Sequence, residues 1–119
     1  ALSNAMPPLE VPSRSATVEL PVGVKNGDGT VDRTAEVRAV TTVDEMNVAM
    51  SREYNQHPND MVYKLLLLGR CVIRLGDRRQ VSLTDIQALH AQDFRALELA
   101  VHELTYGADA PPPESSSPS

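Results

Sequence analysis

The sequence predicts an α+β fold, in which an N-terminal β-hairpin is followed by a three- to four-helix bundle. Two short runs near the N-terminus alternate apolar and polar residues, which is the pattern of strands with one buried face. From residue 42 onward, apolar residues recur at helical spacing, and turn or capping residues separate the runs. A chain of 119 residues is long enough for one modest core, so we expect a single domain.

We expect that domain to span residues 16–107. Residues 1–15 and 108–119 are rich in Pro, Ser and small polar residues, a composition typical of disordered termini. The tripeptide SNA at residues 3–5 resembles the scar of a cleaved tag, which would make Met6 the natural start. The N-terminal segment also lacks the basic and apolar regions of a signal peptide.

The hairpin is predicted from two alternating segments joined by a Gly-rich turn. The residues on their apolar faces are Val18, Leu20, Val22 and Val24 in the first segment and Val31, Ala35, Val37 and Ala39 in the second. The connecting sequence KNGDGT contains Asn-Gly and Asp-Gly, which supply the positive φ angles that a hairpin turn requires. Pro21 predicts an edge strand or a bulge, because proline cannot donate a ladder hydrogen bond.

A first helix is predicted to begin at Thr42, because Thr42 and Glu45 have the spacing of a capping box. It should end by His57, whose position before Pro58 disfavours helical geometry. The residues on its predicted inner face are Val43, Met46, Met50 and Tyr54. We expect Met46, Met50 and Met61 to be core residues, because each lies on a predicted inner face. The alternative is that they line a groove that binds helices, as methionines often do.

The most apolar stretch, MVYKLLLLGRCVIRLG at residues 61–76, predicts a central helix that Asn59 caps and Gly76 ends. The stretch is shorter than the roughly 20 residues of a membrane span and contains three charged residues, so we exclude a span. The residues of its broad apolar face are Met61, Val62, Leu65, Leu66, Leu68, Val72, Ile73 and Leu75. Leu67 and Cys71 fall among the charged residues instead, so both are surplus to the expected core.

Two further helices are predicted near the C-terminus. Thr84 and Gln87 have capping-box spacing and should open a short helix that turns Ile86 and Leu89 inward. A last helix is expected from about Gln92 to Tyr106, with Gly107 in the usual terminating position. Its apolar stripe consists of Phe94, Leu97, Val101 and Leu104.

The two long helices carry apolar residues outside their main stripes. Leu99 and Tyr106 lie seven positions apart, nearly opposite the stripe of the last helix. Together with Leu67 and Cys71, they are our candidate partner-binding residues, on surfaces that could also support a homo-oligomer. The alternatives are packing against the hairpin or simple exposure, which is common on monomers.

Residue composition gives no support to catalysis, metal binding or nucleic-acid binding. The net charge of −5 and only 11 Lys and Arg disfavour phosphate contacts. The single cysteine and the spacing of the three histidines fit no disulfide framework or metal site, and no nucleotide-binding or hydrolase motif is present. The acidic residues of the predicted first turns are explained by the helix dipole, and they include Asp44, Glu45, Asp85 and Asp93. We therefore expect neither an enzyme nor a cofactor.

Four segments together resemble a known family: VELPVG, DGTVDRTAEVRAVTTVDE, LLLLGRCVIRLG and LTDIQALHAQDFRALELAVHELTYG. In order and local pattern they are similar to the small tail assembly chaperones of Mu-like contractile-tailed phages, over about residues 17–107. The resemblance implies a phage or prophage protein, made in the bacterial cytoplasm, that assists assembly by binding a tail structural protein such as the tape-measure protein. It equally allows a permanent component, or an assembly factor, of the baseplate hub, which would reside in the particle. The family has no catalytic signature to carry over.

The predicted helix faces can be tested by substitution. Leu67→Glu or Leu99→Glu is expected to leave folding nearly intact but to weaken binding to a partner or to a second copy. Leu68→Glu is expected to unfold the domain, because it would bury an unpaired charge. Circular dichroism distinguishes the two classes, and an equal loss of helicity in Leu67→Glu and Leu68→Glu would contradict the assigned faces.

Overall fold

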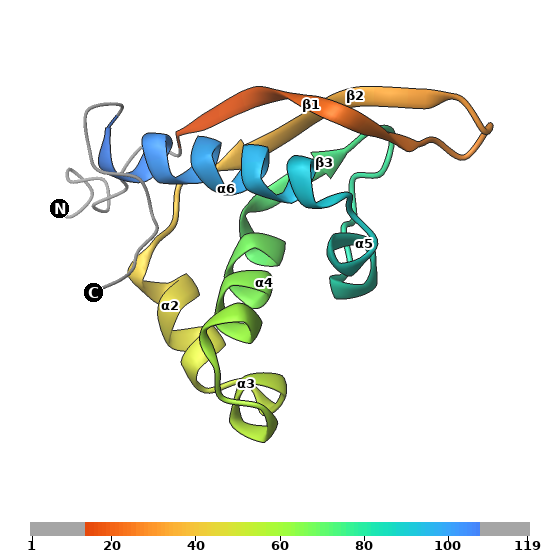
Figure 1. The fold of residues 1–119 in the computed structure, drawn as a ribbon. Helices are drawn as coiled ribbons and strands as arrows, with labels where there is room; N and C mark the ends of the chain where they lie inside the picture. Colours follow the sequence, from red (N-terminus) through yellow and green to blue (C-terminus); the bar gives the residue numbers. More distant parts are fainter. Residues whose placement is uncertain (1–13, 108–119) are drawn as a thin grey trace, which may run out of the picture.

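The computed structural model describes residues 14–107 (Figure 1). Its elements are β1 (Ser15–Lys25), β2 (Val31–Arg38), α2 (Thr42–Ala49), α3 (Arg52–Gln56), α4 (Asp60–Cys71), β3 (Val72–Leu75), α5 (Leu83–Gln87) and α6 (Ala91–Tyr106). The α+β prediction is confirmed, and the sheet comes first as expected. The terminal segments that the sequence predicts as disordered lie, apart from Arg14 and Ser15, outside the described residues.

The sheet is antiparallel, with three strands in the order β1-β2-β3. The predicted hairpin forms its first two strands, and Val18 pairs with Ala35 across it. The prediction that the central helix continues to Gly76 is wrong. That helix ends at Cys71, and the next four residues form β3, in which Val72 pairs with Val37 of β2. The open edge of β2 decides this, because tertiary pairing overrides a local helical pattern.

Strand β1 carries the irregularity that Pro21 predicts. Its register against β2 shifts between Glu19 and Val24. Leu20, before the shift, is completely buried, whereas Val22 turns outward and is 42% exposed, so the predicted apolar face is interrupted there. Beyond the bulge the hairpin tip projects past the rest of the domain (Figure 1), and Val31 is 61% exposed although the alternation predicts it inward.

Helix α6 lies along one face of the hairpin and completes the core (Figure 1). Its stripe agrees with the prediction, since Phe94, Leu97 and Val101 are buried and Leu104 is half-buried. Helix α4 runs away from the sheet, and α2, α3 and α5 pack beside it. The buried core cluster consists of Val18, Leu20, Ala35, Val37, Leu68, Cys71, Val72, Leu75, Ile86, Phe94, Leu97 and Val101.

The inner face predicted for the first helix is wrong. Val43, Met46 and Met50 are 60%, 56% and 74% exposed, and Asp44 and Val48 are buried in their place. The chain also breaks at Ser51, which caps a separate short helix, α3. The predicted core position of Met61 on α4 is wrong as well, because that side chain is 46% exposed.

The residues of both predicted capping boxes are wrong, although a capping box opens each of the two helices. The first pairs Thr41 with Asp44, and the second pairs Ser82 with Asp85. In each case an aspartate at the third helical position reaches the backbone amide of the cap, so Glu45 is released from the capping role that the sequence suggested.

A buried carboxylate at the start of α6 holds the bulge of β1. Asp93 is fully buried, and its two oxygens accept hydrogen bonds from the backbone amides of Val22 and Gly23 at 2.8 and 3.0 Å. The bulge frees these amides from the strand ladder, and a carboxylate satisfies both of them. Asp93 therefore fixes α6 against the sheet as well as lying in a favourable first-turn position.

Replacing Asp93 with Asn should destabilise the domain by about 2 kcal/mol, because the amide group would point a donor at a backbone donor and lose a charge-assisted bond. Urea denaturation measures the change. Asp60→Asn, in the exposed first turn of α4, is the matched control and should change stability little. Equal effects of the two substitutions would show that Asp93 acts only through the helix dipole.

Candidate protein-binding groove

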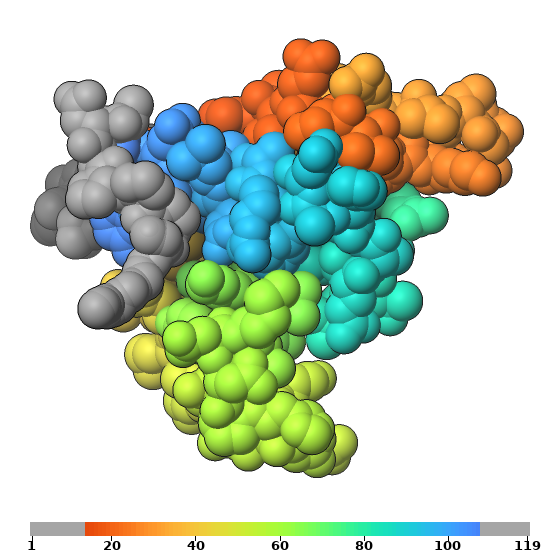
Figure 2. Space-filling model, in the orientation of Figure 1, coloured from red at the N-terminus to blue at the C-terminus, as the bar shows by residue number. Residues whose placement is uncertain are grey.

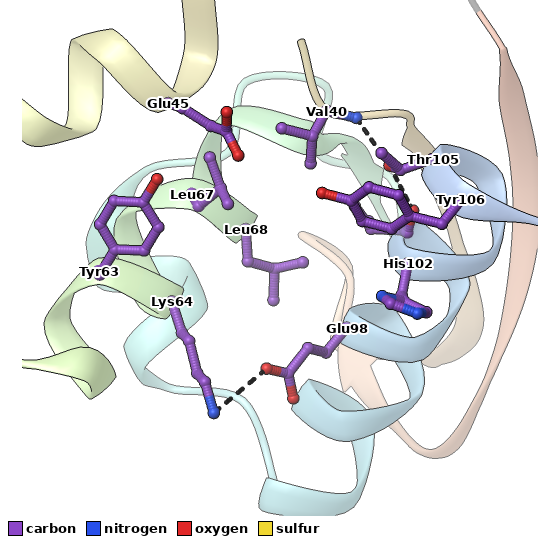
Figure 3. Close-up of a pocket in the computed structure, with 11 residues that line it drawn as sticks. Val40, Glu45, Tyr63, Lys64, Leu67, Leu68, Glu98, His102, Thr105 and Tyr106 are labelled. Atoms are coloured by element: carbon purple, nitrogen blue, oxygen red, sulfur yellow. Dashed lines mark hydrogen bonds and ion pairs between the residues drawn. The ribbon is translucent and has the colours of Figure 1, made fainter. Parts of the chain in front are cut away.

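An apolar groove of about 270 Å³ lies between α4 and α6 (Figure 3). The residues that line it are Val40, Glu45, Tyr63, Lys64, Leu67, Leu68, Glu98, Val101, His102, Thr105 and Tyr106. Helix α4 forms one wall and α6 the other, and the segment between β2 and α2 closes one end. In the space-filling view, α4 and α6 adjoin along a boundary below the sheet (Figure 2).

The groove has a buried floor and open rims. Leu68 and Val101 belong to the core cluster and are 4% and 7% exposed. Leu67 is half-buried, and Tyr106 is 62% exposed, with its ring extending over the space between the helices (Figure 3). Exposed aromatic and aliphatic groups above a solid apolar floor are what a binding groove for another apolar surface requires.

Hydrogen bonds fix the closed end of the groove to α6. The amide of Val40 donates to the Thr105 hydroxyl oxygen at 3.0 Å, and that hydroxyl donates to the carbonyl of Val101 at 2.7 Å. These bonds satisfy a linker amide that no strand or helix would otherwise pair. The linker to α2 is therefore held against the last turn of α6.

Asp44 of α2 joins the α4 wall to its neighbours, and its carboxylate accepts five hydrogen bonds. Arg38 at the end of β2 donates two of them, at 2.7 and 2.9 Å, and Arg70 of α4 donates one at 2.9 Å. The amide and hydroxyl of Thr41 donate the others at 2.9 and 3.0 Å. Arg38 also donates to the carbonyl of Arg70, so β2, α2 and α4 meet at one carboxylate.

This arrangement stabilises the ionised form of Asp44. The hydrogen bonds from Arg38 lower the pKa of Asp44 well below its ordinary value, burial opposes that change, and the bonds from Thr41 and Arg70 lower the pKa further. The same pair raises the pKa of Arg38. The carboxylate of Asp44 and the guanidinium of Arg38 are therefore both charged at physiological pH.

The remaining polar groups of the groove are less well matched. Lys64 Nζ lies 3.9 Å from Glu98 Oε2 across the groove, and Glu98 also accepts from Arg95 at 2.9 Å. Glu45 points into the groove (Figure 3) and makes no ion pair within residues 14–107. His102 Nε2 is buried and has no hydrogen-bond partner among the described residues.

The structure separates the four candidate partner-binding residues. Leu67 and Tyr106 both line the groove, from opposite walls. Leu99 is also exposed, at 44%, and lies seven residues before Tyr106 on the same helix, but it does not line the groove. Cys71 is completely buried in the core, which contradicts its expected place at the surface. The early end of α4 explains this, because Cys71 is the last helical residue before β3.

Burial also determines the chemistry of Cys71. It raises the pKa of the Cys71 thiol to about 11, so the thiol is protonated and inaccessible at neutral pH. Across residues 14–107, no group of three or more His, Cys, Asp and Glu side chains is arranged to hold a metal ion. No helix in the same range is long and apolar enough to cross a membrane.

Sequence patterns missed Tyr63, Lys64 and Glu45 as groove residues. Tyr63 and Lys64 lie next to the apolar face of α4. A helical wheel predicts residues at such positions to border the core, and it gives no sign that they line a groove. The sequence predicts that Glu45 completes the capping box, but in the structure Asp44 does so with Thr41 as the cap, which leaves Glu45 free to face the groove. Thr105 and Val40 carry no sequence signal, because their contact joins residues far apart in the chain.

No protein-family model, curated protein or solved structure gives a significant match to this chain. The resemblance to tail assembly chaperones therefore stays a prediction. The groove and the charges around it are the direct observations from which a function can be argued.

Asp44→Asn should lower stability at neutral pH by about 2–3 kcal/mol, because two partly solvated arginines would lose their counter-charge. Since the pKa of Asp44 is depressed in the folded state, its contribution is present above the unfolded pKa near 3.9 and is lost as pH falls below it. Urea denaturation across the acid range should show a weaker pH dependence in the variant than in the wild type.

Asp85→Asn is the matched control for Asp44→Asn, because Asp85 has the same capping-box position but only a surface arginine partner, Arg78. It should cost much less stability. Equal losses in the two variants would mean that capping, and not the arginine cluster, is what Asp44 contributes.

Proposed function

We propose that this protein is a non-catalytic assembly chaperone for a phage or prophage tail, and that it binds an apolar helix of a tail structural protein in the groove between α4 and α6. The groove itself carries the proposal. Its floor is apolar and its rims are the half-buried Leu67 and the exposed Tyr106. Helix-in-groove binding needs this combination of a preformed apolar trough and adaptable edges.

The chemistry of the groove lining favours an apolar helix over a small molecule. The groove opens between two helices, its exposed surface is mostly apolar, and among its charged lining side chains only Lys64 and Glu98 approach each other. A catalytic or cofactor pocket needs several polar groups that converge on one reacting atom. An amphipathic helix instead needs room for a few apolar side chains and a polar rim, which this groove offers.

The resemblance to tail assembly chaperones supplies the class of partner. Proteins of that kind are expected to bind apolar segments of a long tail protein, the tape measure, until tube subunits replace them. An apolar groove on a small acidic domain suits this task, because it can cover apolar side chains reversibly while the net charge of −5 keeps the complex in solution.

The proposal can be tested by co-expressing the protein with the tail genes of its source and identifying captured proteins by mass spectrometry. Leu67→Glu should reduce capture of a tail protein by at least about ten-fold, because it places a charge in the groove. Leu99→Glu, which the sequence alone predicts to weaken binding, becomes the matched control because Leu99 is exposed but outside the groove, and it should capture as the wild type does. Equal capture by all three proteins would refute the groove as the binding site.

Purified tail particles should contain none of this protein. Presence at fixed copy number would instead identify a permanent baseplate or hub component, and the groove would then be a structural interface.

A further inference from the structure

Glu45 is the one charged side chain lining the groove for which the described residues provide no opposite charge. Lys64 and Glu98 face each other, and Glu98 has a second partner in Arg95. The lining therefore carries net negative charge, located at the end of the groove near α2. A partner that fits this end of the groove should combine an apolar surface with a basic side chain, because the basic side chain can form an ion pair with the carboxylate.

The position of Glu45 is fixed by the fold. It follows Asp44 in the first turn of α2, and the arginine cluster around Asp44 anchors that turn to β2 and α4. The side chain extends toward Leu67 (Figure 3). Burial and the charge of Glu45 both raise the pKa of Tyr63 on the facing wall, which agrees with a carboxylate that acts on the groove interior.

A second polar group in the groove also lacks a partner. His102 Nε2 is buried without a hydrogen bond among the described residues, and its ring lies 5.0 Å from the ring of Tyr106. An unpaired buried nitrogen destabilises the unbound state, and a hydrogen-bonding group on an occupant would remove that cost. In the neutral tautomer protonated at Nδ1, Nε2 is an acceptor, so it would favour a donor.

We propose that the groove selects an amphipathic helix that carries a Lys or Arg at the edge of its apolar stripe, and that this basic side chain pairs with Glu45. The inference rests on the proposed helix-binding function and adds the chemistry of the partner. The net charge of −5 on the chain attracts a basic partner over distance and disfavours a second copy of the same acidic domain.

Synthetic amphipathic helices provide the test. All members of the set share one Leu and Ala stripe, and a single flanking position, scanned along the helix, carries Lys, Gln or Glu. Affinities for the full-length wild type, Glu45→Gln, Glu45→Lys and Glu103→Lys are measured by fluorescence anisotropy at low and high salt. Glu103 is the matched control, because it is an exposed glutamate on α6 outside the groove.

The wild type should bind the best Lys peptide roughly three- to ten-fold more tightly than its Gln counterpart, and high salt should reduce that preference. Glu45→Gln should remove the preference, Glu45→Lys should transfer it to a Glu peptide, and Glu103→Lys should retain it. Circular dichroism should show all variants folded, because Glu45 and Glu103 are exposed.

Failure of the two proposals is distinguishable. If all peptides bind equally and Glu45→Lys changes nothing, the charge selection is refuted while helix binding stands. If no peptide binds at any register, both the groove function and the charge selection are refuted. Self-association of the wild type that Glu45→Lys abolishes would assign the groove to a second copy and would also overturn the proposal.

Discussion

The ion cluster around Asp44 is the constraint on which the helical half of the molecule depends. The hairpin and α4 are separated by many residues, yet Arg38 at the end of β2 and Arg70 in α4 both donate to this carboxylate. A buried carboxylate without these donors would carry a large desolvation cost, so α2 cannot rotate without breaking several bonds together. The cluster therefore fixes the rotation of α2. As a result, Val43, Met46 and Met50 face outward and Glu45 faces the groove.

Asp93 performs a comparable task on the other side of the groove. It holds the start of α6 against the bulge of β1, and Thr105 holds the end of the same helix against the linker at Val40. Asp93 thus positions the α6 wall against β1, and Asp44 positions the α4 wall by accepting a hydrogen bond from Arg70. The core beneath is aliphatic apart from Cys71 and Phe94. Hydrogen bonds to the two aspartates add a directional restraint that aliphatic packing does not supply.

The sequence predicts correctly those features that residues close together in the chain determine. The hairpin, the bulge near Pro21, the stripe of α6 and the end at Gly107 all follow from residues close together in the chain. Sequence periodicity fails where distant residues decide the structure. Val72 and Leu75 have a spacing that suits a helix, and only the edge of β2 makes them a strand. Asp44 and Asp93 looked like ordinary first-turn acids because their partners are remote.

The candidate site was predicted only in part for the same reason. Leu67 and Tyr106 were identified as surplus apolar residues, and they do lie on facing walls of one groove. Cys71 was misplaced because a wheel extended through β3 assigns the wrong face to the last helical residue. Glu45 was misassigned by a single position, since Thr41 and Thr42 are both plausible caps and only the observed bonds distinguish them.

The size of the groove also bears on how a bound helix would behave. A volume of about 270 Å³ holds only a few side chains. Burying about three large apolar side chains contributes on the order of 5–9 kcal/mol, and association opposes this by at least about 4 kcal/mol. The remainder is too small for a permanent complex, so one groove favours reversible binding. Reversible binding is what a chaperone requires if a later structural subunit is to displace it. A permanent component would need further buried surface, and among the described residues the exposed face of Val43, Met46 and Met50 on α2 is one apolar surface that could provide it.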